Sequence, residues 1–346
     1  MPGTESALGR VFDARPDRVD FRDLEYRPPV RSLPPRWPDE AALAKHFPRY
    51  VKDGRVLDQG TEGACTGFGL ACVVNYLRWS RALEAKSAPA LVSPRMLYEL
   101  ARRYDEWPGE GYDGSSCRGA LKGWHKHGVC SEARWPYKGR KPKAGWDAEA
   151  LECTLGVYYR IDRTSVVDMQ AAIAEVGAIY VSARVHDGWN ALPVSAAPRG
   201  HAALPVIAWP KTDERGGHAF ALVGYNEHGF IVQNSWGERW AAGGFAVLPY
   251  DDWVAHGDDA WVAGLGVPVR VSDERRAAMR WPVPSGRSLG WQAKGAANPD
   301  NPSDDPWPVD HPYEYAPYQP WSTAAAYEHT LVTGNDGCIE VSDLMH

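Results

Sequence analysis

The 346-residue sequence has no apolar run near the roughly 18 residues that a transmembrane helix needs. Its first ten residues also lack the apolar core of a signal peptide. Basic residues are not in excess, because 38 Lys and Arg stand against 44 Asp and Glu and the net charge is −6. We therefore expect a cytoplasmic protein that neither enters a membrane nor binds nucleic acid, which usually requires a basic surface.

Cysteine is scarce, and its pattern is that of neither a metal site nor a disulfide scaffold. The sequence has no C-x-x-C pair and no Cys/His cluster with ligand spacing, so we expect no metal and no cofactor. Dispersed cysteines favour a reducing compartment, although a bridge between Cys117 and Cys130 is left open. The six cysteines are Cys65, Cys72, Cys117, Cys130, Cys153 and Cys338.

Cys65 lies between a glycine-broken segment and a helical pattern. Gly60 and Gly63 interrupt regular structure before it, and apolar residues at helical spacing follow from Phe68 to Leu77. This pattern predicts Cys65 on the first turn of a buried helix, whose positive end stabilises a thiolate. A cysteine that only packs in a core has the same local pattern, so a nucleophile needs support from elsewhere in the chain.

Two residues far downstream supply that support. His218 begins an alternating stretch directly after Gly216 and Gly217, and this stretch predicts a strand. Asn234 ends a second apolar stretch 16 positions later (234 minus 218). Antiparallel pairing of the two would let Asn234 orient the imidazole of His218, which then serves as acid and base. Gly217 leaves room for a substrate backbone.

Gln59, six positions before Cys65, completes the set. Its side-chain amide and the backbone N–H of Cys65 can donate hydrogen bonds to the oxyanion of a tetrahedral intermediate. Each residue alone has a simpler interpretation, as a polar loop residue, a core histidine or a turn residue. Together, in the order Gln, Cys, His, Asn, they indicate acyl transfer through a thiolate.

The segments around these four residues resemble the papain-like cysteine peptidases, over roughly residues 50–268. The resemblance implies an α+β fold of two lobes, with the Cys on a mainly helical lobe and the His and Asn on an antiparallel β-barrel-like lobe. It also implies that Trp236 shields the His–Asn hydrogen bond from water. The matching stretches are 58–60 with Cys65, 128–137, 217–225 and 233–245.

The sequence also departs from the familiar pattern of this family. Glu62 and Thr66 stand where the family has a Cys before the nucleophile and a Trp after it, and Tyr112 replaces a disulfide Cys. Gly114 is kept and, by resemblance, pairs with the substrate backbone. Cys117 falls near the pocket for the side chain two before the scissile bond. With no helical pro-region of the usual length, these departures favour the compact bacterial branch of the family.

The chain divides by composition into three parts. Residues 1–50, rich in Arg, Asp and Pro, predict an extended arm that is either a structural strap or an inhibitory leader across the cleft. The peptidase domain is expected at 51–268, with the helical lobe at 51–165 and the β lobe at 166–268. A Pro-rich linker and C-terminal extension, 269–346, ends in a hairpin pattern and is a candidate surface for a protein partner. Helices are expected at 65–83, 93–104, 116–127 and 165–176, and a strand at 178–183.

The sequence thus predicts a cysteine-type peptidase that hydrolyses a peptide or protein substrate through an acyl-enzyme on Cys65. Two alternatives remain open: a thiol acyl or peptidyl transferase of transglutaminase type, and a catalytically inactive binding protein on the same fold. Asn234 in place of an Asp favours the peptidase, and the four filled positions argue against an inactive protein. Substrate contacts are expected at Gly114, Ser115, Ser116, Cys117 and Gly217.

Overall fold

The structure is a computed structural model that describes residues 4–5, 10–29, 48–83, 88–107, 113–139, 141–196, 200–209 and 215–267. These residues fall in one of the two units into which the chain divides. The predicted C-terminal extension, 269–346, and the hairpin at its end lie outside the described residues.

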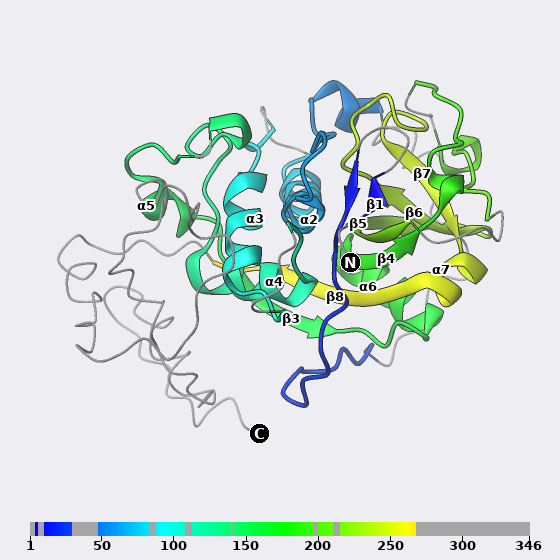
Figure 1. Cartoon of the computed structure of the whole chain (residues 1–346), viewed down its shortest axis with the longest axis horizontal. Coiled ribbons are helices and arrows are strands. Elements are labelled where there is room, and N and C mark those ends of the chain that lie inside the picture. The colour runs from blue at the N-terminus through cyan, green and yellow to red at the C-terminus, as the bar shows by residue number, and fades with distance from the viewer. Residues whose placement is uncertain are drawn as a thin grey trace. The chain divides into compact units, whose positions relative to one another are not determined.

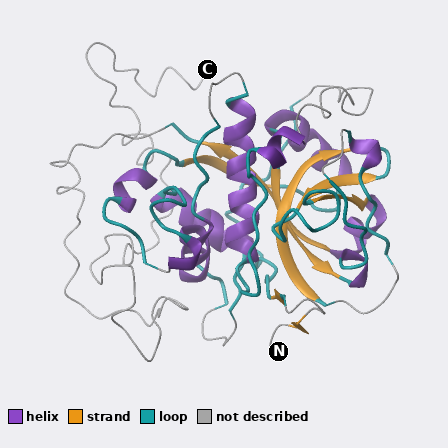
Figure 2. Cartoon of the chain, turned by 90° about the horizontal axis from the view of Figure 1, so that it is seen from above, coloured by secondary structure: helices purple, strands orange, loops and turns teal. Residues whose placement is uncertain are grey.

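Helix α2, Cys65–Arg81, runs between the sheet and the next two helices of the chain (Figure 2). Glycines allow its close packing on both sides. A Cβ at Gly67 would lie 2.5 Å from the Cβ of Tyr98 in α3 (Pro94–Arg103), and one at Gly69 would lie 2.8 Å from the backbone of Ala219 in β5 (Gly216–Tyr225). The first residue of α2 is therefore held directly against the strand that carries His218.

Serines begin three of the helices, as their positions in the sequence predicted. The side chains of Ser93, Ser116 and Ser165 each accept a hydrogen bond from the backbone N–H three residues further on. Such N-caps satisfy N–H groups that have no partner inside the helix. The helices are α2 and α3, α4 (Cys117–His127), α5 (Trp146–Ala150), α6 (Val166–Val176) and α7 (Tyr250–His256), with short 3₁₀ turns at Tyr137–Gly139, Asp187–Trp189 and His201–Ala203.

Six antiparallel strands form the main sheet in the order β3-β8-β4-β5-β6-β7. Its apolar core includes Phe220, Leu222, Phe230 and Val232 on β5 and β6. The range expected for the helical lobe, 51–165, contributes β3 to this sheet. The strands are β3 (Leu155–Arg160), β4 (Ile179–Val185), β5, β6 (Gly229–Gln233), β7 (Phe245–Pro249) and β8 (Gly257–Leu265); β1 (Thr4–Glu5) and β2 (Val11–Phe12) pair separately.

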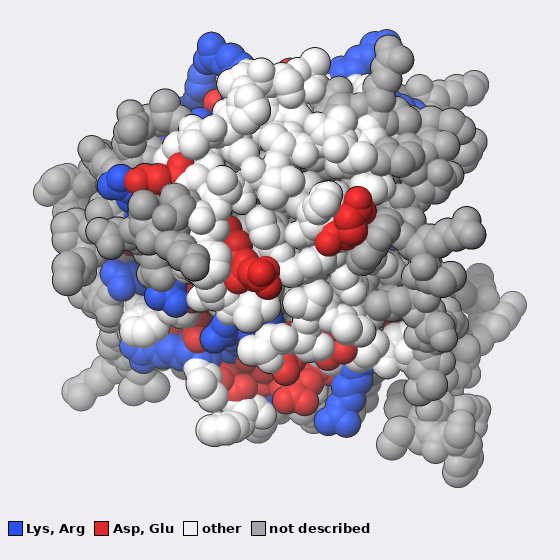
Figure 3. All heavy atoms as spheres, turned by 90° about the vertical axis from the view of Figure 1, so that its right-hand side faces the viewer, with Lys and Arg blue, Asp and Glu red and all other residues white. Residues whose placement is uncertain are grey.

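The face beside the sheet is largely uncharged, with separate acidic groups and with Lys and Arg toward its rim (Figure 3). Among the helices that the structure describes, none combines the length and the apolar character needed to cross a membrane.

Candidate active site

His218 and Asn234 meet at one end of the β5–β6 hairpin. The Nε2 of His218 lies 2.9 Å from the Oδ1 of Asn234, which also accepts the backbone N–H of Ser235 at 2.8 Å. Because Oδ1 can only accept, Nε2 carries the proton and donates it. In a neutral ring Nδ1 then keeps its lone pair, and it has no hydrogen-bond partner among the described residues. His218 is thus prepared to accept a proton at Nδ1.

Aromatic rings enclose His218. Trp236 lies nearest, with its ring centroid 4.9 Å from that of the imidazole, and Phe220 stacks on the ring at 5.7 Å. Trp189 contributes an edge at 6.2 Å. Burial among these rings lowers the pKa of His218 to about 4, although the hydrogen bond to Asn234 favours the charged form. The resemblance had pointed to Trp236 alone.

Cys65 is the first residue of α2 and is fully buried. The preceding Ala64 has no side chain that could cap the helix, so the N–H groups of the first turn remain close to the sulfur. Burial raises the pKa of Cys65 to about 11, and the negative charge of Asp13 acts in the same direction. The backbone N–H groups of Ala219, Asp13 and Thr66 favour the thiolate but do not offset these effects. Burial thus favours the neutral form of both the thiol and the imidazole.

Gln59 is joined to the same segment as Asn234. Its backbone N–H donates to the carbonyl of Ser235 at 3.0 Å, and its Oε1 accepts the Ser235 hydroxyl at 2.8 Å. Its Nε2 donates to the carbonyl of Glu62 at 3.2 Å. The fully buried Ser235 thus couples the position of Gln59 to that of the His–Asn pair.

Glu62, which the sequence marked only as a departure, anchors the loop before Cys65. Its carboxylate pairs with the buried Arg95 of α3 at 2.6 Å and accepts the hydroxyl of Tyr137 at 2.7 Å. The same hydroxyl lies 2.9 Å from the carbonyl of Gln59. An ion pair therefore stands where the family has a disulfide Cys. No local pattern indicates it, because Arg95 lies 33 positions away.

The residues expected to bind substrate instead bind the N-terminal arm. The backbone N–H of Gly114 donates to the carboxylate of Asp13 at 3.0 Å. The carbonyl of Gly217 accepts the N–H of Ala14, and the carbonyl of Ser115 accepts the N–H of Arg15, both at 3.0 Å. Ser116 also pairs with Arg15 in a parallel β-bridge and caps α4. The fifth residue, Cys117, is buried at the start of α4.

The arm therefore runs along the boundary between the helices and the sheet, where it appears in blue in Figure 1. Phe12 is almost fully buried and lies 5.6 Å from the ring of Trp236 and 6.1 Å from that of His218. At one end Arg10 donates to the carbonyls of Gly60 and Trp236. Residues 10–17 thus cover the thiol, the imidazole and both walls beside them.

One group of residues in the described ranges has the composition of a metal site: His186, Asp252 and His256. The Nδ1 of His186 accepts the N–H of Gly188, so its Nε2 carries a proton and donates to Asp252 at 2.9 Å. His256 donates to the other carboxylate oxygen at 2.7 Å. These contacts form a closed hydrogen-bond network that leaves His186 no lone pair for a metal. Cys117 and Cys130, whose bridging was left open, are both free.

Comparisons with known proteins identify the family of the chain. The model of the papain family cysteine proteases matches residues 51–253. An uncharacterized peptidase C1-like protein of Acanthamoeba polyphaga mimivirus is 27% identical over 202 residues, which are 56% of this chain and 64% of the viral protein.

Solved structures extend the likeness to the fold. Xylellain, a cysteine protease from Xylella fastidiosa, is 25% identical with a TM-score of 0.59, over 77% of this chain and 98% of its own. Procathepsin B S9 from Trypanosoma congolense has a TM-score of 0.54 at 16% identity, over 75% of this chain and 87% of its own, and is alike in fold alone. The chain belongs to the papain family of cysteine proteases.

Proposed function

We propose that the protein is a cysteine peptidase that hydrolyses peptide bonds through an acyl-enzyme on Cys65. The observation that carries this proposal is the hydrogen bond from His218 Nε2 to Asn234, which leaves Nδ1 as a base. The next residue on the strand, Ala219, donates its backbone N–H to the Cys65 sulfur. A thiol, a base and a group that orients the base are the parts that nucleophilic catalysis needs.

In the proposed reaction the Cys65 proton moves to His218 Nδ1, and the sulfur bonds to the substrate carbonyl carbon. The carbonyl electron pair passes to the oxygen, which accepts hydrogen bonds from Gln59 and the Cys65 N–H. The C–N bond then breaks as Nδ1 returns its proton to the leaving amine. Water next adds to the thioester carbonyl and gives a proton to Nδ1. The C–S bond then breaks, the acid leaves, and Nδ1 returns the proton to the sulfur.

We further propose that residues 10–17 keep this site latent, as an inhibitory leader rather than a strap alone. The arm occupies the main-chain hydrogen-bonding groups of Gly114, Ser115 and Gly217, which an extended substrate would use. It also excludes water from Cys65 and His218, and burial favours their neutral forms. Displacement of the arm would restore both the substrate groove and a solvated thiolate–imidazolium pair.

The test is turnover and covalent labelling, with a peptidyl epoxide directed at thiols, of the full-length chain carrying Gly114→Ala, whose Cβ would collide with Asp13 and displace the arm. Cys65→Ala should abolish both, whereas Cys72→Ala, which removes another buried thiol of the same helix, should leave both in place. Product analysis with an added amine separates the alternatives: hydrolysis supports the peptidase, and transfer to the amine supports a peptidyl transferase. Labelling of Cys65 without any turnover would point to a binding protein.

The cellular setting is part of the same proposal. The five described cysteines, Cys65, Cys72, Cys117, Cys130 and Cys153, are free, which fits a reducing compartment such as a bacterial cytoplasm. We propose peptide or protein substrates there, with no role for nucleic acid or membrane, and the C-terminal extension as a surface for a protein partner. Fractionation of producing cells, with the enzyme followed by thiol labelling, tests the location.

A further inference from the structure

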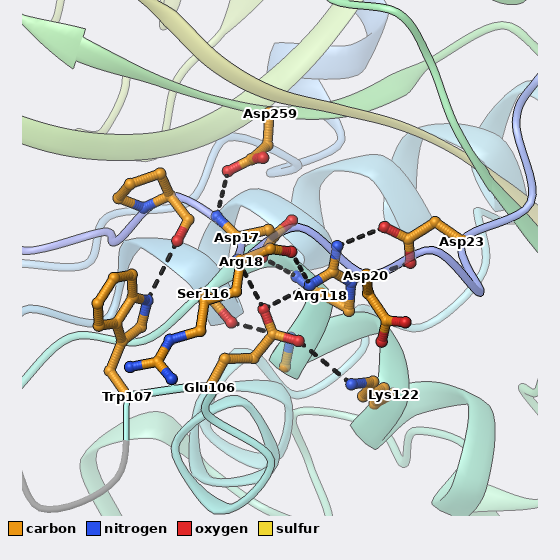
Figure 4. A network of polar contacts seen from close by, with 12 residues as sticks. Asp17, Arg18, Asp20, Asp23, Glu106, Trp107, Ser116, Arg118, Lys122 and Asp259 are labelled. Atoms are coloured by element: carbon orange, nitrogen blue, oxygen red, sulfur yellow. Dashed lines mark hydrogen bonds and ion pairs between the residues drawn. The ribbon is translucent and has the colours of Figure 1, made fainter.

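The arm carries one acidic side chain, Asp17, into a buried network of polar contacts that includes Arg118 and Asp259 (Figure 4). We call the surroundings of this carboxylate the Asp17 pocket. Asp17 lies three residues after Ala14. The backbone N–H of Ala14 donates to the carbonyl of Gly217, the residue before His218. In an extended chain three residues span about 10 Å. The Asp17 side chain is fully buried, although removing a carboxylate from water costs free energy. The pocket must therefore offer the carboxylate specific partners.

Two N–H groups and one guanidinium surround this carboxylate. Oδ1 accepts the backbone N–H of Arg118 in the first turn of α4 at 2.8 Å, where the helix dipole favours an anion. Oδ2 accepts the indole N–H of the fully buried Trp261 at 2.8 Å. The Nη1 of Arg160 lies 3.7 Å from Oδ2. These groups belong to α4, β8 and β3 and are present whether or not the arm is bound.

One acidic residue, Asp259, lies at the same pocket and opposes a second negative charge. Its Oδ1 is paired with Arg160 at 2.5 Å. Its Oδ2 accepts the hydroxyl of Ser182 at 3.1 Å and the backbone N–H of Asp17 at 2.9 Å. Asp259 therefore recognises the main chain of the occupant, and its ion pair with Arg160 offsets only part of its charge. The pKa of Asp17 is raised, chiefly by burial and then by Asp259.

The charges of the body around the pocket complement those of the arm. Arg118, Arg160 and Lys122 supply three positive charges against two negative charges from Asp259 and Glu106. The arm adds Asp17 and also Asp23, which forms an ion pair with Arg118. Without Asp17 and Asp23 of the arm, these five groups of the body carry one net positive charge, three positive against two negative.

We propose that the pocket filled by Asp17 is a substrate subsite that takes an acidic side chain, Asp or Glu, of the peptide to be cut. This inference rests on the proposed function, because it treats the groove that holds the arm as the groove that holds substrate. Cys117 is buried beside Asp17 and Asp259, so the pocket coincides with the one that the sequence resemblance assigned to the side chain two before the scissile bond.

The test uses the full-length chain with two substitutions. Asp17→Ala empties the pocket of its own carboxylate, and Gly114→Ala displaces the rest of the arm, because its Cβ would collide with the backbone of Asp13. Fluorogenic peptides that differ at one position carry Asp, Glu, Asn, Leu or Arg there, and each position on the amino-terminal side of the cleaved bond is varied in turn. We expect kcat/KM for the Asp or Glu peptide to exceed that for Leu and Arg by about tenfold or more at one position, as loss of a charged hydrogen bond implies.

Two variants in the same doubly substituted background identify the cause of that preference. Trp261→Phe, which lacks the indole N–H, should reduce the ratio of acidic to Leu peptide, and Asp259→Asn, which removes the opposing charge, should raise it. A preference for Arg that Asp259→Asn abolishes would overturn the subsite, as would equal cleavage of all peptides. If no peptide is cut and Cys65 is not labelled, the proposed function fails together with the subsite.

Discussion

The carbonyl oxygen of Asp13 lies 1.6 Å from the place where a Cβ on Gly114 would stand. All three atoms nearest to that position belong to Asp13, so the arm alone forbids a side chain there. On the opposite wall Gly217 has the same relationship with Ala14, whose carbonyl oxygen would be 2.0 Å away. The arm therefore fits the groove only because both walls present bare backbone.

Gly114→Ala should displace the arm while leaving the body of the enzyme folded. An overpacking cost of about 1–3 kcal/mol corresponds to a roughly 5- to 150-fold larger open population. The rate at which iodoacetamide alkylates Cys65 in the full-length chain should rise by that factor. Gly264→Ala is the matched control, because its nearest neighbour would be an ordinary contact at 3.4 Å. Equal rates for the two variants would contradict the latent state.

The pH dependence of that alkylation reports the environment of the thiol. Only the thiolate reacts, and burial raises the pKa of Cys65 to about 11. The rate in the unmodified chain should therefore be low near neutrality and rise with pH toward 11. In Gly114→Ala, water returns to the sulfur and the rise should move to lower pH. Identical profiles for the two proteins would show that the arm does not control the thiol.

Asn234→Ala should leave His218 in place but free to turn. Loss of an oriented acid and base typically costs about 10²–10⁴-fold in rate, so kcat should fall by at least about 10²-fold with a smaller change in KM. Asn234→Asp keeps the acceptor and adds a negative charge, which should raise the pKa of His218 from its low value. A basic shift of the acidic limb of the kcat profile in Asn234→Asp, relative to the unsubstituted enzyme, checks this relationship. An unchanged kcat in Asn234→Ala would remove Asn234 from the mechanism.

Glu62→Ala should lower stability and activity together. It leaves the buried guanidinium of Arg95 with the carboxylate of Glu99 at 3.2 Å but without its partner at 2.6 Å. Because Glu62 is about one-third exposed, we expect a loss of about 1–3 kcal/mol in the free energy of unfolding, measured in urea. The peptidase rate should also fall as Gln59 loses its anchor.

A control for this pair lies in the arm itself. Glu25 pairs with Arg27 at 3.6 Å, and both side chains are largely exposed. Exposed ion pairs contribute little, so Glu25→Ala should change the free energy of unfolding by less than about 0.5 kcal/mol. Similar losses for Glu62→Ala and Glu25→Ala would refute a special role for the Glu62–Arg95 pair.

Features that depend on neighbours along the chain were predictable from the sequence. Ser93, Ser116 and Ser165 cap helices because a serine bonds to the N–H three residues on, which is a local interaction. The strands around His218 and Asn234 followed from alternation and from the intervening turn. The hydrogen bond that joins the two residues was therefore within reach of sequence reasoning.

The path of the arm was decided by the tertiary structure. The sequence left it as a strap or a leader, because residues 10–17 have neither helical nor strand periodicity. Asp13 meets Gly114 across 101 positions, and Asp17 meets Trp261 across 244. Contacts of this kind have no local pattern, since they join segments far apart in the sequence that only the folded chain brings together. The sequence alone determined the order Gln59, Cys65, His218, Asn234 and the helices and strands that carry these residues. The tertiary structure decided that the arm covers Cys65, because only the folded cleft brings the bare backbone of Gly114 and Gly217 to the two sides of one peptide segment.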